Sequence, residues 1–217
     1  MDHIDTYKYP GEDVLINKFD CHDPEVLYRL EADSTAGNLL YLQLHPVHGK
    51  FDFNHLKRIH RFIFQDVYEW AGKIRTVDIG KNNLFCRAQF IEDYAATVFR
   101  DFYSSCSETK EDYEKFVKVL TDHYADMNAL HPFREGNGRA QREFTRELCL
   151  KCGYVFDLTE TTHEEMLDAS ITSFSNGDNT KLMQIFRRCI VPINEYSDDL
   201  QGIMQEQLLI LSRDDMG

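Results

Sequence analysis

The sequence predicts a mainly α-helical protein of one domain with one small β-hairpin. Apolar residues at helical spacing dominate the chain, and a single short stretch alternates in the manner of a strand. With 217 residues the chain can bury one sizeable core, and a second full domain would be a tight fit. The composition, 42% hydrophobic and 28% charged, is that of an ordinary soluble globular protein.

The helical pattern is clearest over residues 54–71 and 111–130. Gly72 is expected to end the first of these helices, because glycine commonly stands just past a helix C-terminus. Another helix is expected over 90–105. The apolar positions that define the first two are Leu56, Ile59, Ile63, Val67 and Trp70, then Tyr113, Phe116, Val117, Leu120, Tyr124, Met127 and Leu130.

Three further helices are expected towards the C-terminus. One begins near Thr161, where the letters TTHEE offer two alternative capping boxes, Thr161 with Glu164 or Thr162 with Glu165. A last core helix should span about 178–190, with Asp178 as its cap and Pro192 as its stop. The segment 197–211 has the pattern of an additional amphipathic helix.

Residues 74–79, with the sequence IRTVDI, alternate and are rich in β-branched side chains. Residues 81–83 resemble a turn, and residues 84–86 could return as a short strand. This predicts a small hairpin on a helical body. An isolated hairpin is marginally stable, so it must lean on the helices or be completed by another chain.

The net charge and the cysteine pattern make several kinds of ligand and chemistry improbable for this chain. A formal charge of −13 argues against a nucleic-acid backbone or an anionic membrane as the main ligand. No apolar run approaches the ~20 residues that span a bilayer. The polar, acidic N-terminus is not a secretory signal, so we expect a cytoplasmic protein, with delivery into another cell left open. Cys149 and Cys152 form a CxxC without partner ligands, and core thiols are expected there.

The stretch that carries chemistry is LHPFREGNGRAQREF, residues 130–144. It follows one helical pattern and runs into another, and Pro132 places His131 at the very end of the first helix. Gly136 and Gly138 let the backbone turn sharply and let a ligand approach closely. The next helix then begins with unpaired N–H groups, which with the helix dipole make an anion site.

Side chains around this turn suit a nucleotide phosphate. Arg139 and Arg142 are three apart in the second helix and project from neighbouring positions on one face. Two guanidinium groups beside free amides suit a polyphosphate better than one carboxylate. Glu135 is a hard oxygen ligand for Mg²⁺, and His131 is the nearby group that can accept a proton near neutral pH. No GxxxxGK[ST] sequence occurs, so the site is not a P-loop.

The letters HPFREGNGRAQR, residues 131–142, resemble the Fic family motif HPFx[DE]GNGRxxR at every defined position. The similarity extends over roughly 51–190. It implies a Fic fold, a helical bundle with a β-hairpin flap beside the active-site loop. We therefore expect an N-terminal extension over 1–50, a Fic core over 51–191 and a tail over 192–217.

The resemblance implies protein adenylyltransferase activity, with AMP moved from ATP to a Ser, Thr or Tyr hydroxyl of a target protein. His131 would deprotonate that hydroxyl so that it attacks the α-phosphate. Glu135 would coordinate Mg²⁺ between the α- and β-phosphates. Phe133 would be buried and anchor the loop that holds the nucleotide.

The remaining motif residues are implied to hold the donor. Asn137 and the backbone around Gly136 and Gly138 would bind phosphate oxygens, Arg139 the β- and γ-phosphates, and Arg142 the γ-phosphate. Gly138 also bears on the reaction, because family members that act as kinases carry Lys at this position. Glycine here favours AMP transfer. A different donor, giving phosphocholine or UMP transfer, and an inactive target-binding module are the alternatives.

The family's flap corresponds to the predicted hairpin, where a target segment would add as a strand by backbone pairing. Either Leu84 or Phe85 could clamp the target, or both could simply pack down. The residues assigned to target docking are Lys81, Asn82, Asn83, Leu84, Phe85 and Cys86.

Many Fic enzymes are silenced by a helix with the pattern [ST]xxxE[GN], whose Glu pairs with the second motif arginine. Serine or threonine stands four residues before Glu108, Glu111 and Glu165, but none of these glutamates is followed by Gly or Asn. The resemblance therefore implies that a separate small antitoxin supplies the inhibitory helix. The chain would be the toxin of a toxin–antitoxin pair.

Overall fold

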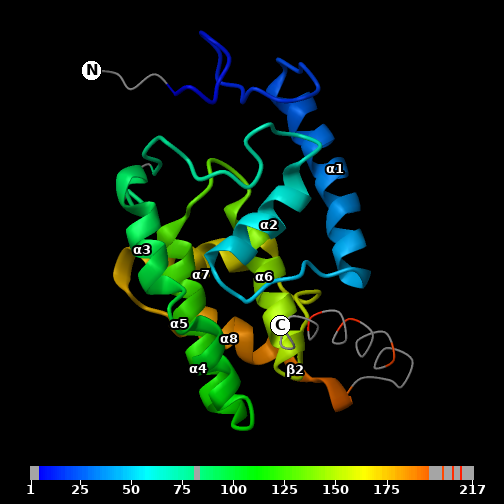
Figure 1. The fold of residues 1–217 in the computed structure, drawn as a ribbon, viewed down its shortest axis with the longest axis vertical. Coiled ribbons are helices and arrows are strands. Elements are labelled where there is room, and N and C mark those ends of the chain that lie inside the picture. Colours follow the sequence, from blue (N-terminus) through cyan, green and yellow to red (C-terminus); the bar gives the residue numbers. More distant parts are fainter. Residues whose placement is uncertain (1–4, 81–83, 196–201, 203–206, 208–210, 212–217) are drawn as a thin grey trace.

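The computed structural model describes residues 5–80, 84–195, 202, 207 and 211, and it is built almost entirely of helices (Figure 1). The mainly helical fold is confirmed. Its elements, in chain order, are α1 (Pro24–Leu44), α2 (Phe53–Phe64), the 3₁₀ turn η1 (Ala88–Phe90), α3 (Ile91–Val98), α4 (Phe102–Thr109), α5 (Tyr113–Leu130), α6 (Asn137–Lys151), β1 (Tyr154–Phe156), α7 (His163–Asn176), α8 (Thr180–Cys189), β2 (Ile190–Pro192) and the 3₁₀ turn η2 (Ile193–Glu195).

Helices α5 and α6 form the centre of the molecule. Helix α2 packs against α6, while α4, α7 and α8 pack against α5, and α1 lies along α2 at the edge of the bundle (Figure 1). Phe116, Leu120, Phe144 and Leu148 are fully buried where these helices meet. Burying such side chains contributes about 1.5–3 kcal/mol each, which makes this contact the rigid base for the loop between α5 and α6.

The predicted helix over 111–130 is confirmed as α5, whereas two other predictions need correction. The helix expected over 54–71 ends at Phe64, and a turn follows in which the Val67 and Tyr68 N–H groups both donate to the Phe64 carbonyl, at 3.0 and 2.9 Å. The Tyr68 and Trp70 rings then stack at 4.2 Å, so the apolar positions beyond Phe64 are buried by a compact turn.

The helix expected over 90–105 is two helices, α3 and α4. The break lies between Phe99 and Asp101. The Asp101 carbonyl accepts hydrogen bonds from the Ser104 and Ser105 hydroxyls, at 3.1 and 2.7 Å, which starts the second helix locally.

Both C-terminal core helices are confirmed, with details that the sequence left open. Of the two capping boxes, the structure uses Thr162, whose hydroxyl accepts the Glu165 N–H at 3.1 Å. Helix α8 begins at Thr180 rather than 178, and the prediction of Asp178 as its cap is wrong. The N-cap residue is Asn179, and Asp178 accepts the Thr180 N–H at 2.9 Å from one position earlier. The amphipathic helix predicted over 197–211 lies outside the described residues except at three positions.

The predicted hairpin is wrong in its location. Among the described residues of 74–80 and 84–87 no strand forms, and the two-stranded antiparallel sheet is β1 with β2, in the register Tyr154↔Pro192. The two flap arms share the backbone bond from Phe85 N–H to Ile79 O at 3.2 Å. The Val77 and Cys86 carbonyls accept hydrogen bonds from the Arg75 side chain, and the Cys86 N–H donates to the Ala129 carbonyl of α5. These backbone groups are therefore not available for hydrogen bonds between two strands. The predicted turn at 81–83 lies outside the described residues.

Cys149 and Cys152 are buried, as expected of core thiols. Burial raises the pKa of the Cys152 thiol to about 12, so it stays protonated and unreactive at neutral pH. Within the described part of the chain, no helix combines the length and the apolar character needed to cross a bilayer.

Candidate active site

The loop between α5 and α6, residues 131–136, begins at a strained residue. His131 caps α5 in the left-handed region, with φ 44° and ψ 61°, and its N–H still reaches the Met127 carbonyl at 3.3 Å. Its position at the end of the helix is therefore confirmed. A non-glycine residue in this conformation costs about 1–3 kcal/mol and persists where the surroundings hold it, as they commonly do at functional sites.

The His131 imidazole is set up to accept a proton at Nε2. Its Nδ1 lies 3.2 Å from the Asn128 carbonyl, which can only accept, so Nδ1 carries the hydrogen. Burial lowers the pKa of His131 to about 4, and the nearby positive charge of Arg75 acts in the same direction. The ring is consequently neutral near pH 7, with an unprotonated Nε2.

An aromatic side chain from the flap covers this imidazole. The Phe85 ring stacks on the His131 ring with 3.8 Å between centroids and 12° between planes, and its other neighbour is Phe174 of α7 at 4.6 Å. Leu84 beside it is 54% exposed. Of the two flap side chains considered from the sequence, Phe85 packs down and Leu84 is presented outwards.

Gly136 is required by both backbone conformation and space. Its φ is 78°, and an added Cβ would stand 2.1 Å from the Phe64 ring. Within the described residues, no side chain caps the N-terminus of α6, which begins directly after this glycine. The first-turn N–H groups of a 15-residue helix are thus free to meet an anion.

Two motif residues hold the loop together from within. The Asn137 side chain accepts the Phe133 N–H at 2.9 Å and donates to the Phe133 carbonyl at 2.8 Å. Phe133 is fully buried, as expected. Because both ends of the Asn137 amide bind the loop, the structure gives this residue a positioning contact, and its implied bond to a phosphate oxygen stays a prediction.

His60 on α2 contacts the loop through Glu135 and Phe133, a role that the sequence analysis did not predict. Its Nδ1 accepts the Gly72 N–H at 2.9 Å, so its Nε2 carries the hydrogen and donates to the Glu135 carbonyl at 2.9 Å. Its ring stacks on Phe133 at 3.8 Å. Burial lowers the pKa of His60 to about 3, which keeps it neutral. The available signal was a histidine at helical spacing from the apolar residues Leu56 and Ile63.

A cavity of about 600 Å³ opens over the start of α6. Glu135, Gly136, Gly138, Arg139 and Arg142 line one wall, and His131 lies outside this lining under Phe85. The opposite walls come from the N-terminal segment, α1, the turn after α2 and the start of α7, through Asp13, Val14, Leu15, Pro24, Leu27, Tyr28, Glu31, Ala32, Tyr68 and His163. Residues between 13 and 32 therefore complete the walls of this cavity.

Arg139 is held by an acidic residue of α1 that the sequence did not single out. Its guanidinium donates to Glu31 at 2.5 Å and to the Thr35 hydroxyl at 3.1 Å, and it lies 4.6 Å above the Phe64 ring. Tyr68 donates to the other oxygen of Glu31. Arg139 has five N–H donors, and these contacts fix its plane while leaving donors for a ligand.

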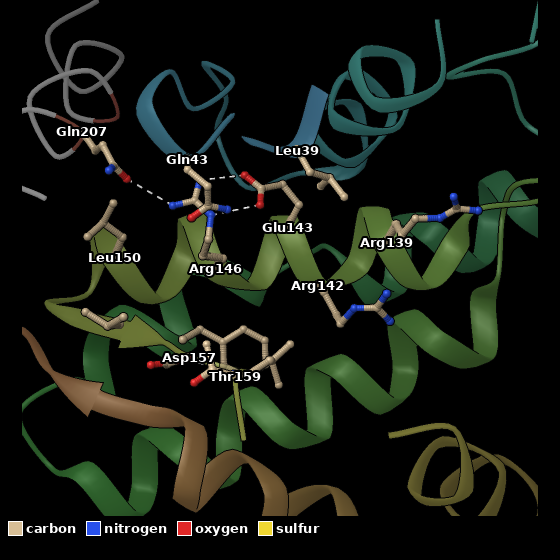
Figure 2. A pocket seen from close by; sticks show the side chains of 13 residues that line it. Leu39, Gln43, Arg139, Arg142, Glu143, Arg146, Leu150, Asp157, Thr159 and Gln207 are labelled. Atoms are coloured by element: carbon tan, nitrogen blue, oxygen red, sulfur yellow. Dashed lines mark hydrogen bonds and ion pairs between the residues drawn. The ribbon is translucent and has the colours of Figure 1, made fainter. Parts of the chain in front are cut away.

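Arg142 and Arg139 project from neighbouring positions near the start of α6, as predicted (Figure 2). The buried Tyr124 hydroxyl lies beside Arg142, whose positive charge counteracts the upward effect of burial on the pKa of Tyr124. Figure 2 shows a second cavity, of about 560 Å³, that runs from these arginines along α6 past Glu143 and Arg146. The two arginines thus separate two hollows.

Glu135 is placed to share a cation with phosphates. One carboxylate oxygen accepts the Gly136 N–H at 2.7 Å and lies 3.8 Å from Arg139, and the side chain is 48% exposed on the cavity wall. Mg²⁺ typically takes one or two protein carboxylates and completes its shell with phosphate oxygens and water. A single exposed carboxylate beside an anion site therefore fits Mg²⁺ bound together with a nucleotide.

The family model described as Fic/DOC matches residues 50–149. Among curated proteins, "Probable protein adenylyltransferase y4lH" of Sinorhizobium fredii is 39% identical, over 86% of this chain and 96% of that protein. "Probable protein adenylyltransferase Fic" of Salmonella typhimurium is 34% identical over 88% and 94%. "Protein adenylyltransferase VbhT" of Bartonella schoenbuchensis is 36% identical over 94% of this chain, which spans 43% of that longer relative.

Solved structures share the fold. The N-terminal Fic domain of a Bartonella quintana effector with bound ADP superposes with a TM-score of 0.81 and 26% identity, over 86% of this chain and 94% of that one. BepC of Bartonella tribocorum with bound AMPPNP gives a TM-score of 0.80 at 23% identity, over 86% and 96%. Both of these structures therefore contain an adenine nucleotide bound to a protein of this architecture.

Proposed function

This chain belongs to the Fic family, and from this premise we propose that it is, like its relatives, a protein adenylyltransferase. In the proposed reaction it moves AMP from ATP to a Ser, Thr or Tyr hydroxyl of a target protein. The observation that carries the proposal is the convergence on one loop of a neutral imidazole, an uncapped helix N-terminus and two arginines. Each group serves a different need of the reaction, namely a base, a phosphate cradle and charge neutralisation.

In the proposed reaction the target hydroxyl approaches His131 from the flap side. Nε2 takes the hydroxyl proton while the oxygen attacks the α-phosphorus of ATP, and the bond to the β-phosphate breaks. AMP ends on the hydroxyl oxygen, pyrophosphate leaves, and the proton remains on the imidazole until solvent removes it. A neutral ring is needed at the start, and burial supplies it.

On the donor side the chain would bind charge and hold geometry. The first-turn N–H groups of α6, Arg139 and Arg142 would bind phosphate oxygens, with Arg139 already oriented by Glu31. Glu135 would hold Mg²⁺, which supplies additional positive charge against the α- and β-phosphates. Positioning and charge neutralisation of this kind account for most catalysis of phosphoryl and nucleotidyl transfer.

Target docking on the flap is part of the proposal. Leu84 is exposed beside the aromatic cover of His131, so a target segment lying along residues 84–86 would bring its hydroxyl near Nε2. Backbone pairing would supply most of the affinity, and Leu84 an apolar contact.

The test is transfer of label to protein from α-labelled ATP with Mg²⁺ in a cell lysate, with γ-labelled ATP as the parallel arm. Label that depends on the added chain is expected from the α-position and not from the γ-position, and it should disappear in His131→Ala. His22→Ala is the matched control, since His22 is an exposed histidine paired with Glu12. Competition by UTP or CDP-choline stronger than by unlabelled ATP would contradict the donor assignment.

We also propose that the chain acts in the cytoplasm as the toxin of a toxin–antitoxin pair. The support is the absence from the printed sequence of the inhibitory pattern [ST]xxxE[GN]. A small partner would then supply the missing glutamate to Arg142. Co-expression of the chain with its genomic neighbour and isolation of the complex test this. A chain that is fully inactive alone, with no partner, would contradict it.

A further inference from the structure

Arg75 follows α2 and is only 1% exposed, although it carries one of the largest polar side chains. Its Nε donates to the His131 carbonyl at 2.9 Å, one terminal nitrogen donates to Val77 O at 2.8 Å, and the other donates to Cys86 O. The Arg75 N–H also donates to the Pro132 carbonyl at 2.9 Å. One residue therefore binds both arms of the flap and the first two residues of the active-site loop.

The partners of the Arg75 guanidinium are backbone carbonyls. Buried charges are generally paired, yet among the described residues the Arg75 side chain hydrogen-bonds to carbonyl oxygens, and the charge of Asp78 favours the cation without forming an ion pair. Its charge instead faces carbonyl oxygens, including that of His131 at the C-terminus of the 18-residue helix α5. The negative end of the helix dipole favours a cation there. Burial lowers the pKa of Arg75, but an arginine remains charged at neutral pH.

The atoms joined by Arg75 surround the catalytic imidazole. Cys86, which receives one of its bonds, also donates its N–H to the Ala129 carbonyl at 3.2 Å, and the preceding residue, Phe85, covers the His131 ring. The flap is thus held beside the base by the Arg75 side chain together with the bond from Cys86 to Ala129, and not by a β-ladder. This accounts for a flap that keeps its place although its arms are not strands.

We propose that Arg75 is a positioning residue that holds the flap and the His131 imidazole in register, so that a docked hydroxyl meets Nε2. The assignment rests on the proposed function for its catalytic meaning. It predicts a separation of effects, because Arg75 does not line the cavity over α6 where the donor would bind. Loss of its bonds should impair transfer to protein and spare binding of the nucleotide.

Two substitutions separate charge from geometry. Arg75→Lys keeps a cation but cannot direct donors to three carbonyls in different directions, and Arg75→Met removes the charge as well. Arg187→Met is the matched control, because Arg187 is a half-exposed arginine of α8 that pairs with Glu114 on the surface. AMPPNP affinity, label transfer from α-ATP in one lysate, and the His131 ring signals in NMR are measured for each variant.

For Arg75→Lys we expect transfer to fall about 10- to 100-fold, since displacement of a reacting group by about 1 Å has effects of this size. The Kd for AMPPNP should stay within about twofold of wild type, as a separate donor pocket requires. The Phe85 ring-current shift on His131 should decrease, because the two rings lose their fixed stacking. Arg187→Met should match wild type in all three measurements.

The His131 titration gives a readout that a purely structural role would not move. The groups facing this ring are the Arg75 cation, the Asn128 carbonyl and the uncharged ring of Phe85, with Phe174 behind it. Removing the cation in Arg75→Met should raise the pKa of His131 from about 4. If that variant does not fold, the ring-current shift in Arg75→Lys takes its place.

The proposal is overturned if Arg75→Lys transfers AMP at the wild-type rate, or if nucleotide affinity and transfer fall together by the same factor. Failure of the proposed function looks different, since wild type itself would then transfer no label. In that case the NMR measurements still decide the placement of the imidazole. An unchanged His131 signal in both variants would overturn the role of Arg75.

Discussion

The two sides of the 131–136 loop are built on opposite principles. On the donor side, Arg139, Arg142 and Glu135 are charged side chains on the wall of an open cavity of about 600 Å³. On the acceptor side, His131 is buried under Phe85, and the charge nearest to it belongs to a guanidinium that binds backbone carbonyls. The donor side is open to solvent and would act through charge. The acceptor side is buried and acts by holding the imidazole in place.

The difference follows from what each side must do. A triphosphate brings several negative charges and needs cations and N–H groups that are free to meet it. A general base must instead be neutral and fixed in direction, and burial secures the first while the Asn128 and Arg75 contacts secure the second. The two sides should therefore fail independently when they are changed one at a time.

The largest effect is expected where both sides meet, at Gly136. In Gly136→Ala the new methyl group collides with Phe64 at a backbone φ of 78°. We therefore expect the free energy of unfolding to fall by about 3 kcal/mol, and AMP transfer to fall to the background level. The control is Gly177→Ala, which has a φ of 68° and no heavy atom within 4 Å of the added carbon. Its loss should be only about 1 kcal/mol in urea unfolding. Equal losses would contradict the steric argument.

The next effect concerns the two neutral imidazoles. The pKa values of His60 and His131 are about 3 and about 4 in the folded protein, below the ordinary value of 6.5. As pH falls below 6.5, the unfolded chain takes up protons that the folded chain does not, so the free energy of unfolding should fall by up to about 1.4 kcal/mol per pH unit for each group.

Urea unfolding between pH 7.5 and pH 5 measures this slope before most carboxylates titrate. In His60→Asn the change in the free energy of unfolding per pH unit should become smaller, because one fewer group takes up a proton on unfolding. It should become smaller again when His131 is also replaced. A slope that does not change on replacing His60 would show that this ring is protonated or exposed in the folded protein.

A smaller effect, confined to the donor side, is expected for Arg139→Ala. The loss of charge-assisted hydrogen bonds to phosphate should weaken AMPPNP binding about 10- to 100-fold. The His131 NMR signals should stay as in wild type, because Arg139 contacts α1 and the Phe64 ring rather than the flap. Arg187→Ala, at an arginine paired on the surface with Glu114, is the control. A displaced His131 signal in Arg139→Ala would show that the two sides are coupled.

The smallest effect is expected for Leu84→Ala on the acceptor side. Leu84 is exposed, so stability and AMPPNP affinity should not change, while the KM for the target should rise about two- to tenfold through loss of one apolar contact. Ile171→Ala, an equally exposed apolar position on α7, is the control at 54% exposure. A change in kcat without a change in KM would contradict a docking role.

Much of the donor side could be predicted because its chemistry is contiguous in sequence. Glu135, Gly136, Arg139 and Arg142 lie within one turn and one helix start, where local spacing fixes direction. The expected position of His131 followed from Pro132 in the same way. By contrast, Glu31 lies 108 residues before its partner Arg139, and no local spacing brings them together.

The flap shows where local reasoning fails. Alternating β-branched residues at 74–79 indicate a strand, but a strand requires a partner for its backbone groups, and the Arg75 side chain and the end of α5 compete for them. His60 is a comparable case, since its role depends on the Glu135 carbonyl 75 residues away.

By itself the sequence determined the helical class and the residue types and spacing of the 131–142 motif, because these depend on neighbours along the chain. The tertiary structure alone decided which side chain covers the imidazole, which acid holds Arg139 and why the flap needs no ladder. Those outcomes depend on burial and on contacts between distant segments, and burial is a property of the packed molecule.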